Sequence, residues 1–526
     1  MKNIYIMVIL LTISAVSFAQ ETEKTYSREA DGRLLLKTNA TTEIQEFTKE
    51  DPIIWYTPLN ISQNENEDSR DFGIAMGPDS TLHMVYCDDR PLPGAYSQRI
   101  VHRSKGFYEE EWSEDVIIDE FSGLAPRNNH KASINVSNNG NIHVVYHYWA
   151  YDGTGRDQVG YTKYTKDTDT WSSEVISGDA GTIASVYSDY PKLTTTTNNI
   201  TVVVWGTDNR NGNDEAYLAY DNGGWQEPIL ISSPEMNKAQ WPVVVAAEDE
   251  QVLVLFREYT DTHDSLSVYY RVFDASTGDL GPIHKIQRSQ RLSTSNFDYY
   301  DQFTACYANN NKVFIADNAR DTIHSYYFDM NTEILSKNHE VHISNYTGNP
   351  NYNLMSVCAD DDDIIHFCNT IWNVSSNAVR YISYEEGVGF GEDEIVSHED
   401  AIDAPRIIWG VDKELHIAFC DDSEDTNDDG YVDREVYYTT EDNTLGWSEN
   451  SANHTTFNVY PNPSSTGVFT TDLKENYTIA VYRISGELIY SSENASEIDL
   501  SSYANGVYIM KARNAKYNLM IKLIKK

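Results

Sequence analysis

The sequence contains few cysteines: only five among 526 residues, and no two of them form a Cys-x-x-Cys pair. An odd number of cysteines in an exported chain cannot all be paired. We therefore expect most of them to be buried as small residues rather than to carry the fold as disulfides. They are Cys87, Cys306, Cys358, Cys368 and Cys420.

Long apolar runs are also scarce. One run, Ile4 to Leu11, follows a Lys at position 2 and precedes small residues up to Gln20. This is the pattern of a secretory signal peptide over residues 1–20, and the run is too short for a membrane span. No other run approaches that length. We therefore expect a soluble, exported protein with no membrane span.

Basic residues are outnumbered, with 39 Lys and Arg against 81 Asp and Glu and a net charge of −42. The electrostatic field of so negative a chain repels polyanions, so the sequence argues against a general nucleic-acid-binding or anionic-membrane-binding protein. The simplest interpretation is a solvated acidic surface suited to a salty exterior. At high salt the screening length falls to about 3 Å, so a few local Arg and His residues could still bind an anionic polymer.

Helix-forming heptads are absent, whereas aromatic residues make up 12% of the chain, with 37 Tyr and 10 Trp. This composition favours a large β-rich core. From about residue 68, similar units recur, each with a short strand, a turn, an apolar second strand and a Tyr-rich third strand. The second-strand segments are LHMVYC (82–87), IHVVYH (142–147), TVVVWG (201–206), VLVLFR (252–257), VFIADN (313–318), IIHFCN (364–369) and LHIAFC (415–420).

Seven units of about four strands predict an all-β protein built on a seven-bladed β-propeller. We place the propeller at residues 52–450, after an N-terminal extension at 21–51. One four-stranded blade cannot bury both of its faces, so the blades must stack radially around a channel.

The repeats separate scaffold histidines from candidate site histidines. His83, His143 and His416 recur at one place in three units, so we expect them to be hydrogen-bonded parts of the blades. His130 opens a first strand, at the place that Tyr190 and Trp241 hold in the next two units.

His147 ends a second strand, at a position that varies between units. First strands line the channel of a propeller, so we expect His130 and His147 at its rim, although two hydrogen-bonded structural histidines remain an alternative. The residues aligned with His147 are Cys87, Gly206, Arg257 and Cys420.

The C-terminal segment 458–526 breaks the repeat. It contains Tyr460-Pro-Asn-Pro463, Gly467, the stretches VYRISGELI and IDLSSYANGVY, and a Lys-rich end. With these pieces it resembles the C-terminal sorting domain of type IX secretion. The resemblance implies a small β-sandwich that serves as an address for the secretion machinery, with a secreted or cell-surface location.

Two metal sites are conceivable. Asp425, Asn427, Asp429 and Asp433 have the spacing of an EF-hand-type loop with Gly430 at its sharp turn, so we expect a structural calcium ion there. The glutamate that usually ends such a loop is replaced by Val436. A structural zinc ion is a second hypothesis, on soft ligands from neighbouring units. Its candidate ligands are Cys358, His366, Cys368 and Cys420.

The chain resembles the seven-bladed polysaccharide lyases that degrade ulvan, a sulfated rhamnose–uronate polymer of green algae. In that family a His and a Tyr on adjacent blades work with an Arg. The resemblance implies catalytic roles for His130, His147 and Tyr190. It leaves the Arg open between Arg210 and Arg257, because Gly206 stands where the family pattern favours it. Trp241 is the expected substrate-binding residue.

These residue types suit β-elimination. An Arg holds the uronate carboxylate and stabilises the enolate-like transition state, a His or Tyr removes the C5 proton, and the other protonates the leaving O4. No organic cofactor is required, and the enzyme is expected to be a monomer. Two other functions stay open: a non-catalytic glycan- or protein-binding propeller, and a propeller glycoside hydrolase. The Ser-x-Asp-x-Gly-x-x-Trp boxes of sialidases are absent from the sequence.

Overall fold

At several strand ends the computed structural model describes only the backbone. The residues that it describes form strands and no helix. These residues are 25–28, 34–37, 55–63, 68–92, 95–106, 109, 111–123, 132–150, 156–177, 186–209, 214–236, 238–259, 266–286, 303–319, 322–342, 355–372, 377–391, 394–397, 401–424, 433–441, 459–471, 478–483, 488–493, 496–513 and 518–526. None of them forms a helix that is long and apolar enough to span a membrane.

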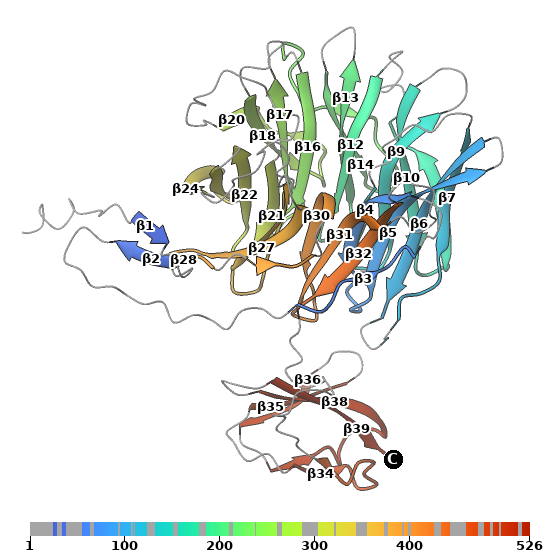
Figure 1. Cartoon of the computed structure of the whole chain (residues 1–526), viewed down its shortest axis with the longest axis vertical. Helices are drawn as coiled ribbons and strands as arrows, with labels where there is room; N and C mark the ends of the chain where they lie inside the picture. The colour runs from blue at the N-terminus through green and yellow to red at the C-terminus, as the bar shows by residue number, and fades with distance from the viewer. Residues whose placement is uncertain are drawn as a thin grey trace, which may run out of the picture. The chain divides into compact units, whose positions relative to one another are not determined.

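Seven antiparallel sheets form a ring of blades, as the sequence predicts (Figure 1). Blades one to three consist of β4 (Asp68–Met76), β5 (Leu82–Leu92), β6 (Ala95–Lys105) and β7 (Val116–Gly123); β8 (Ser133–Val136), β9 (Ile142–Ala150), β10 (Arg156–Thr165) and β11 (Thr170–Val175); and β12 (Val186–Thr195), β13 (Thr201–Asn209), β14 (Ala216–Asp221) and β15 (Ile229–Leu230).

In blades four and six the outer strand is split into two short pieces. Blades four to six consist of β16 (Lys238–Ala246), β17 (Gln251–Tyr259), β18 (Leu266–Asp274), β19 (Asp279–Leu280) and β20 (His284–Ile286); β21 (Phe303–Ala308), β22 (Lys312–Ala319), β23 (Thr322–Asp329) and β24 (Ile334–His342); and β25 (Met355–Ala359), β26 (Ile365–Trp372), β27 (Asn377–Glu385), β28 (Gly389–Phe390) and β29 (Glu394–Ile395).

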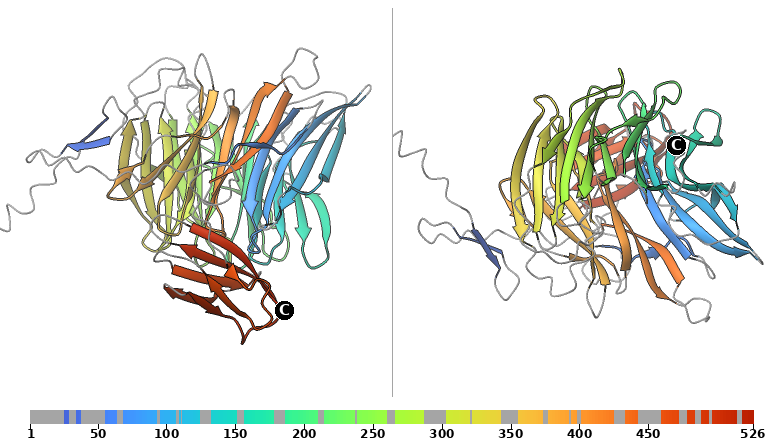
Figure 2. Two further views of the ribbon diagram at one scale, coloured as in Figure 1. Left: turned by 60° about the horizontal axis from the view of Figure 1, so that its bottom comes forward. Right: turned by 90° about the horizontal axis from the view of Figure 1, so that it is seen from above.

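The seventh blade joins both ends of the ring. It consists of β30 (Ala401–Trp409), β31 (Leu415–Glu424), β32 (Asp433–Thr440) and β3 (Leu59–Asn60), which comes from the start of the propeller. Leu59 pairs with Tyr438, and the Tyr56 N–H donates to the Thr440 carbonyl at 3.0 Å. Orange β30 and β32 lie next to blue β4, and the ring is thereby closed (Figures 1 and 2).

The first strands are innermost, each touching the first strand of the next blade, from β4 through β8, β12, β16, β21 and β25 to β30 and back to β4. The apolar cores lie between blades. Consecutive second-strand residues such as Val202, Val203 and Val204 are all fully buried, because both faces of a blade pack against neighbours. This explains why the second strands are continuously apolar in the sequence rather than alternating.

One repeat boundary was wrong. Ile365 pairs with Ala359 as Ile142 pairs with Val136, so the second strand of blade six begins its repeat at residue 365 rather than 364. This register makes His366 the equivalent of His143. Ile364 belongs to the preceding turn, where its carbonyl accepts a hydrogen bond from the Asp360 N–H at 3.0 Å.

The C-terminal segment is a small β-sandwich, as expected. One sheet has β33 (Val459–Tyr460), β34 (Val468–Thr471) and β37 (Glu497–Asp499); the other has β36 (Leu488–Glu493), β35 (Thr478–Arg483), β38 (Gly506–Arg513) and β39 (Asn518–Lys525). Phe469, Ile479 and Ile498 are fully buried in its core. The ammonium of Lys525 is buried and donates to the Leu500 and Ser501 carbonyls at 3.1 and 2.8 Å. This lysine is therefore a structural part of the basic end.

Near the N-terminus the chain forms an antiparallel pair, β1 (Thr25–Arg28) and β2 (Leu34–Lys37), within a separate unit that spans residues 1–53. The sequence patterns did not indicate these two strands. The expected signal peptide at residues 1–20 lies outside the described residues.

Candidate functional site

A cavity of about 310 Å³ occupies the channel, and all seven first strands contribute to its lining. This volume lies at the lower end of the roughly 300–1,000 Å³ typical of small-ligand sites. The described lining residues include three cations, Lys192, Arg257 and Arg406, and no Asp or Glu. The described part of the lining thus carries three cations in a chain whose net charge is −42.

Arg257 is fully buried and belongs to the lining of the cavity. Its guanidinium lies over the Trp241 ring, with Cζ 3.7 Å from the ring centroid. Cation–π stacking on Trp holds the planar guanidinium in one orientation. An Arg can bind a carboxylate through two parallel hydrogen bonds. The pair thus places a guanidinium and an indole together in the lining of the cavity.

A β-bulge presents Trp241 to the cavity. The register between β16 and β17 shifts between Gln240 and Val243, and Trp241 has a backbone φ of +55°. A bulky residue rarely adopts this conformation, and such strain persists only where the surrounding structure enforces it. Asp71 has a φ of +52° in the equivalent bulge of blade one.

Tyr190 occupies the corresponding bulge of blade three, between Asp189 and Lys192, although its side chain lies outside the described residues. The predicted equivalence of Tyr190 and Trp241 is therefore confirmed for the backbone. His130 and Arg210 lie outside the described residues altogether. Among the described residues of the two first strands, Ser133 pairs with Val145 as Lys192 pairs with Val204.

His147 is buried in β9, at the register that Arg257 holds in blade four, two blades away. It does not line the cavity, whereas Arg257 does. Gly206, one blade before Arg257, lies against the bulge of blade four: a Cβ there would meet Gln240 Cα and Trp241 N at 3.4 Å.

His143 is hydrogen-bonded within and between blades, as predicted. Its Nδ1 lies 2.7 Å from the Tyr161 hydroxyl and 3.1 Å from Thr201 Oγ1 of the next blade, and its Nε2 lies 3.1 Å from Ser137 Oγ. His416 makes the same 2.7 Å contact with Tyr438 on its third strand. Burial lowers the pKa of His143 to about 3, so the ring is neutral.

His366 belongs to the same scaffold set. Its Nδ1 lies 2.7 Å from the Tyr381 hydroxyl and its Nε2 3.3 Å from Asp360. Both ring nitrogens are thus engaged, and among the described residues no three His, Cys, Asp or Glu side chains are grouped so that they could hold a metal ion. The four zinc candidates therefore do not assemble into a site.

The five cysteines are free thiols, four of them buried and Cys306 partly exposed, as the sequence led us to expect. Burial raises the pKa of the Cys358 and Cys368 thiols. The predicted calcium ligands Asp425, Asn427 and Asp429 lie outside the described residues, and Asp433 is described only as the backbone start of β32. The calcium site stays a prediction.

The two ends of the ring differ. Between first and second strands, short turns are hydrogen-bonded from blade to blade: the Asn139 N–H donates to Asn199 at 3.1 Å and the Asn198 N–H to Glu250 at 3.0 Å. Glu248 and Asn309 make similar bonds to the following blades. We call this end of the ring, which is formed by the turns between first and second strands, the turn belt. The bulges and the ends of the second strands, with Arg257, lie at the opposite end of the blades.

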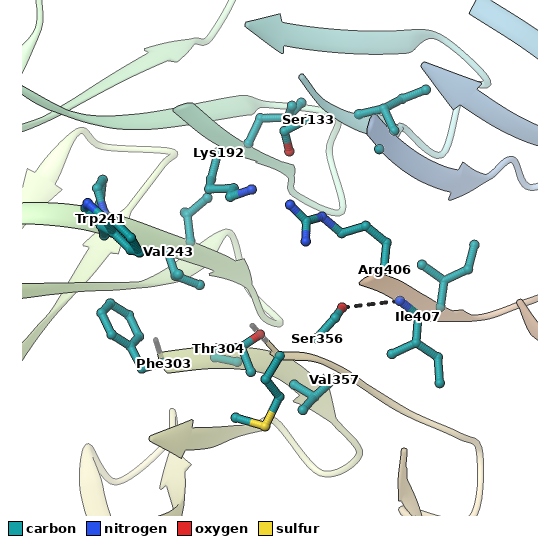
Figure 3. Close-up of a pocket in the computed structure, with 18 of the residues that line it drawn as sticks. Ser133, Lys192, Trp241, Val243, Phe303, Thr304, Ser356, Val357, Arg406 and Ile407 are labelled. Carbon is teal, nitrogen blue, oxygen red and sulfur yellow. Dashed lines mark hydrogen bonds between the residues drawn. The ribbon is translucent and has the colours of Figure 1, made fainter. Parts of the chain in front are cut away.

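Sequence reasoning missed Lys192 and Arg406, which line the cavity from blades three and seven (Figure 3). Each directly follows a proline in a bulged first strand, in the segments DYPK and DAPR. A basic residue after the proline of a first strand was the signal that could have identified them.

Comparisons with known proteins identify the C-terminal domain. Residues 458–526 match the secretion system C-terminal sorting domain. The protein is thus addressed to the cell surface or the extracellular space by type IX secretion. No curated protein matches the chain.

Several solved structures are similar at low identity. A PL25 ulvan lyase is 12% identical, with 73% of this chain and 93% of that chain covered and a TM-score of 0.47. The polysaccharide lyase Uly1 is 10% identical, with 76% of this chain and 94% of that chain covered and a TM-score of 0.43. An α-L-arabinofuranosidase of Fusarium graminearum is 12% identical, with 63% of this chain and 98% of that chain covered and a TM-score of 0.41. Similarity of this degree does not assign the chain to a family.

Proposed function

We propose that this protein is a secreted polysaccharide lyase that cleaves ulvan by β-elimination at its uronate residues. The observation that carries the proposal is the positive cavity in an otherwise strongly acidic protein, with Arg257 fixed on Trp241 at its wall. A site of this charge favours an anionic ligand over a neutral one.

The reaction needs the uronate carboxylate to be neutralised, because the C5 proton is otherwise far too weakly acidic. Arg257 binds the carboxylate and stabilises the negative charge that develops on it in the transition state. Its burial strengthens this interaction, since little water is present to screen it. Arg210 is the alternative for this role.

Proton transfer falls to His130, His147 and Tyr190. One of them accepts the C5 proton, the C4–O4 bond breaks as the C4–C5 double bond forms, and a second one gives a proton to the leaving O4. The indole of Trp241 contacts the sugar ring. Electrons and protons balance without an oxidant, a reductant or an organic cofactor.

Product mass separates the three candidate functions. The purified protein is incubated with ulvan, and the products are analysed by mass spectrometry. A lyase gives oligosaccharides that are one water lighter than the products of hydrolysis. Products with the full mass of hydrolysis would overturn the lyase proposal in favour of a glycoside hydrolase, and binding without any product would leave a glycan-binding propeller.

A further inference from the structure

One residue from each blade forms a single layer across the channel. Each of the seven first-strand residues pairs with the fourth residue of its second-strand repeat, as Ser133 does with Val145 and Lys192 with Val204. All seven line the cavity, and Figure 3 labels the side chains of six. In blade order they are Gly73, Ser133, Lys192, Val243, Thr304, Ser356 and Arg406.

This layer lies below the Arg257 level. Arg257 is the sixth residue of its second-strand repeat, two residues beyond the layer. At roughly 3.3 Å per residue, the two levels are on the order of 7 Å apart along the strands. The layer is thus a second group of polar side chains, separate from Arg257 and Trp241.

The layer carries two cations and three hydroxyls that approach from different sides of the channel. Lys192 and Arg406 belong to blades three and seven, with two blades between them on one side and three on the other. Ser356 Oγ accepts a hydrogen bond from the Ile407 N–H at 3.2 Å, so its own proton is directed elsewhere (Figure 3). Arg406 Nη1 donates to the Pro405 carbonyl at 3.1 Å. No Asp or Glu is among the described residues that line the cavity.

Such donors suit a tetrahedral oxyanion better than a carboxylate. A carboxylate has two oxygens in one plane and is matched by one guanidinium. A sulfate ester has three free oxygens that point in different directions, and a Lys ammonium, an Arg fork and hydroxyls can each bind a different one.

We propose that Lys192, Arg406 and Ser356 form a subsite inside the channel that binds a sulfate ester of the polysaccharide, on a sugar next to the uronate at Arg257. This inference rests on the proposed function for the identity of the polymer. It assigns a specificity role to residues that do not take part in the elimination.

The test compares native ulvan with chemically desulfated ulvan. For the wild-type protein we expect a higher kcat/KM on the sulfated polymer. In Lys192→Gln and Arg406→Gln the ratio of the two values should fall by roughly 10–100-fold toward one, as expected for loss of a hydrogen-bonded charge contact. Lys413→Gln, which removes an exposed partner of Asp361 in the turn belt, is the matched control and should keep the ratio. Variants that retain the wild-type preference for sulfate would overturn the subsite.

A binding experiment keeps the subsite testable if the lyase reaction is absent. Isothermal titration of the same proteins with sulfated polymer, desulfated polymer and inorganic sulfate is independent of turnover. Preferential binding of the sulfated polymer that is lost in Arg406→Gln supports the subsite even without catalysis. Equal binding of both polymers by the wild type overturns it, and saturation by inorganic sulfate alone would show a site for the free anion instead.

Discussion

The guanidinium of Arg257 lies over the indole ring of Trp241, with 3.7 Å between Cζ and the ring centroid. The contact joins a second strand to the bulge of the first strand in the same blade. It fixes a permanent positive charge in the channel wall of a protein whose surface is acidic. The proposed binding of the uronate carboxylate depends on this contact.

Replacing Arg257 tests its role. We expect Arg257→Lys to lower turnover of ulvan by roughly 10²–10³-fold, because an ammonium cannot stack on Trp241 or bind a carboxylate through two parallel bonds. Trp241→Phe keeps a ring and should cost less than Trp241→Ala. Rates are compared at a temperature at which circular dichroism shows each variant folded. Near-normal turnover by Arg257→Lys would assign the carboxylate to another residue, such as Arg210.

The histidines should divide by role. We expect His130→Ala, His147→Ala and Tyr190→Phe to lower turnover by about 10²–10⁴-fold, the usual cost of losing a general acid or base. His143→Ala should instead lower the free energy of unfolding by roughly 1–3 kcal/mol, because it leaves Tyr161 and Thr201 without their buried partner. Turnover per folded molecule and the melting temperature are measured on each variant. Loss of turnover in His143→Ala with unchanged stability would contradict the division.

Acid should destabilise the propeller through its scaffold histidines. Nδ1 of His83 lies 3.1 Å from Nε2 of His102, which is on the third strand of the same blade. Burial lowers the pKa of His83 to about 4 and that of His102 and His143 to about 3. Below pH 6.5 the unfolded chain binds protons at these rings that the folded protein does not, so stability is lost as the pH falls from about 6.5 toward 3. Each ring contributes up to about 1.4 kcal/mol per pH unit.

The pH effect is measured as urea unfolding at several values between pH 7 and 5. His143→Gln should be less stable at pH 7 but should show a shallower pH dependence than the wild type. An unchanged slope would mean that the carboxylates, not the buried imidazoles, govern the acid response.

Calcium should stiffen the loop of blade seven. We expect a chelator to lower the melting temperature of the wild type, and Asp425→Ala with Asp429→Ala to abolish that difference. Asp362→Ala, an exposed acidic residue in the turn belt, serves as the control and should respond as the wild type does. If the chelator has no effect on the wild type, the segment is an acidic turn without a metal ion.

The blade count followed from the sequence because the second strands are buried on both faces and therefore repeat visibly. Blade six was misaligned by one residue at Ile364 and Ile365, two identical apolar residues at the end of a turn that only pairing can distinguish. The same slip hid His366 among metal candidates, although its partner Tyr381 matches Tyr161 and Tyr438 on the third strands.

The candidate site was only partly predictable. Arg257 and Trp241 were found as positions that vary between repeats, but their contact depends on a bulge. The bulges at Trp241 and Tyr190 are shifts in the register between two strands, and a repeat alignment contains no such information. The layer with Lys192 and Arg406 became visible only through the registers of all seven blades, because its members share a level and not a residue type.

The most direct test of the account is the ultraviolet absorbance of ulvan during incubation with the protein. β-Elimination creates a conjugated C4–C5 double bond in each new uronyl end, so a lyase predicts absorbance that rises in proportion to the number of chains cut. Wild-type protein should give this rise, and Arg257→Lys protein, folded and at the same concentration, should give it at least about a hundredfold more slowly. Cleavage that yields new reducing ends without any rise in absorbance would contradict the account.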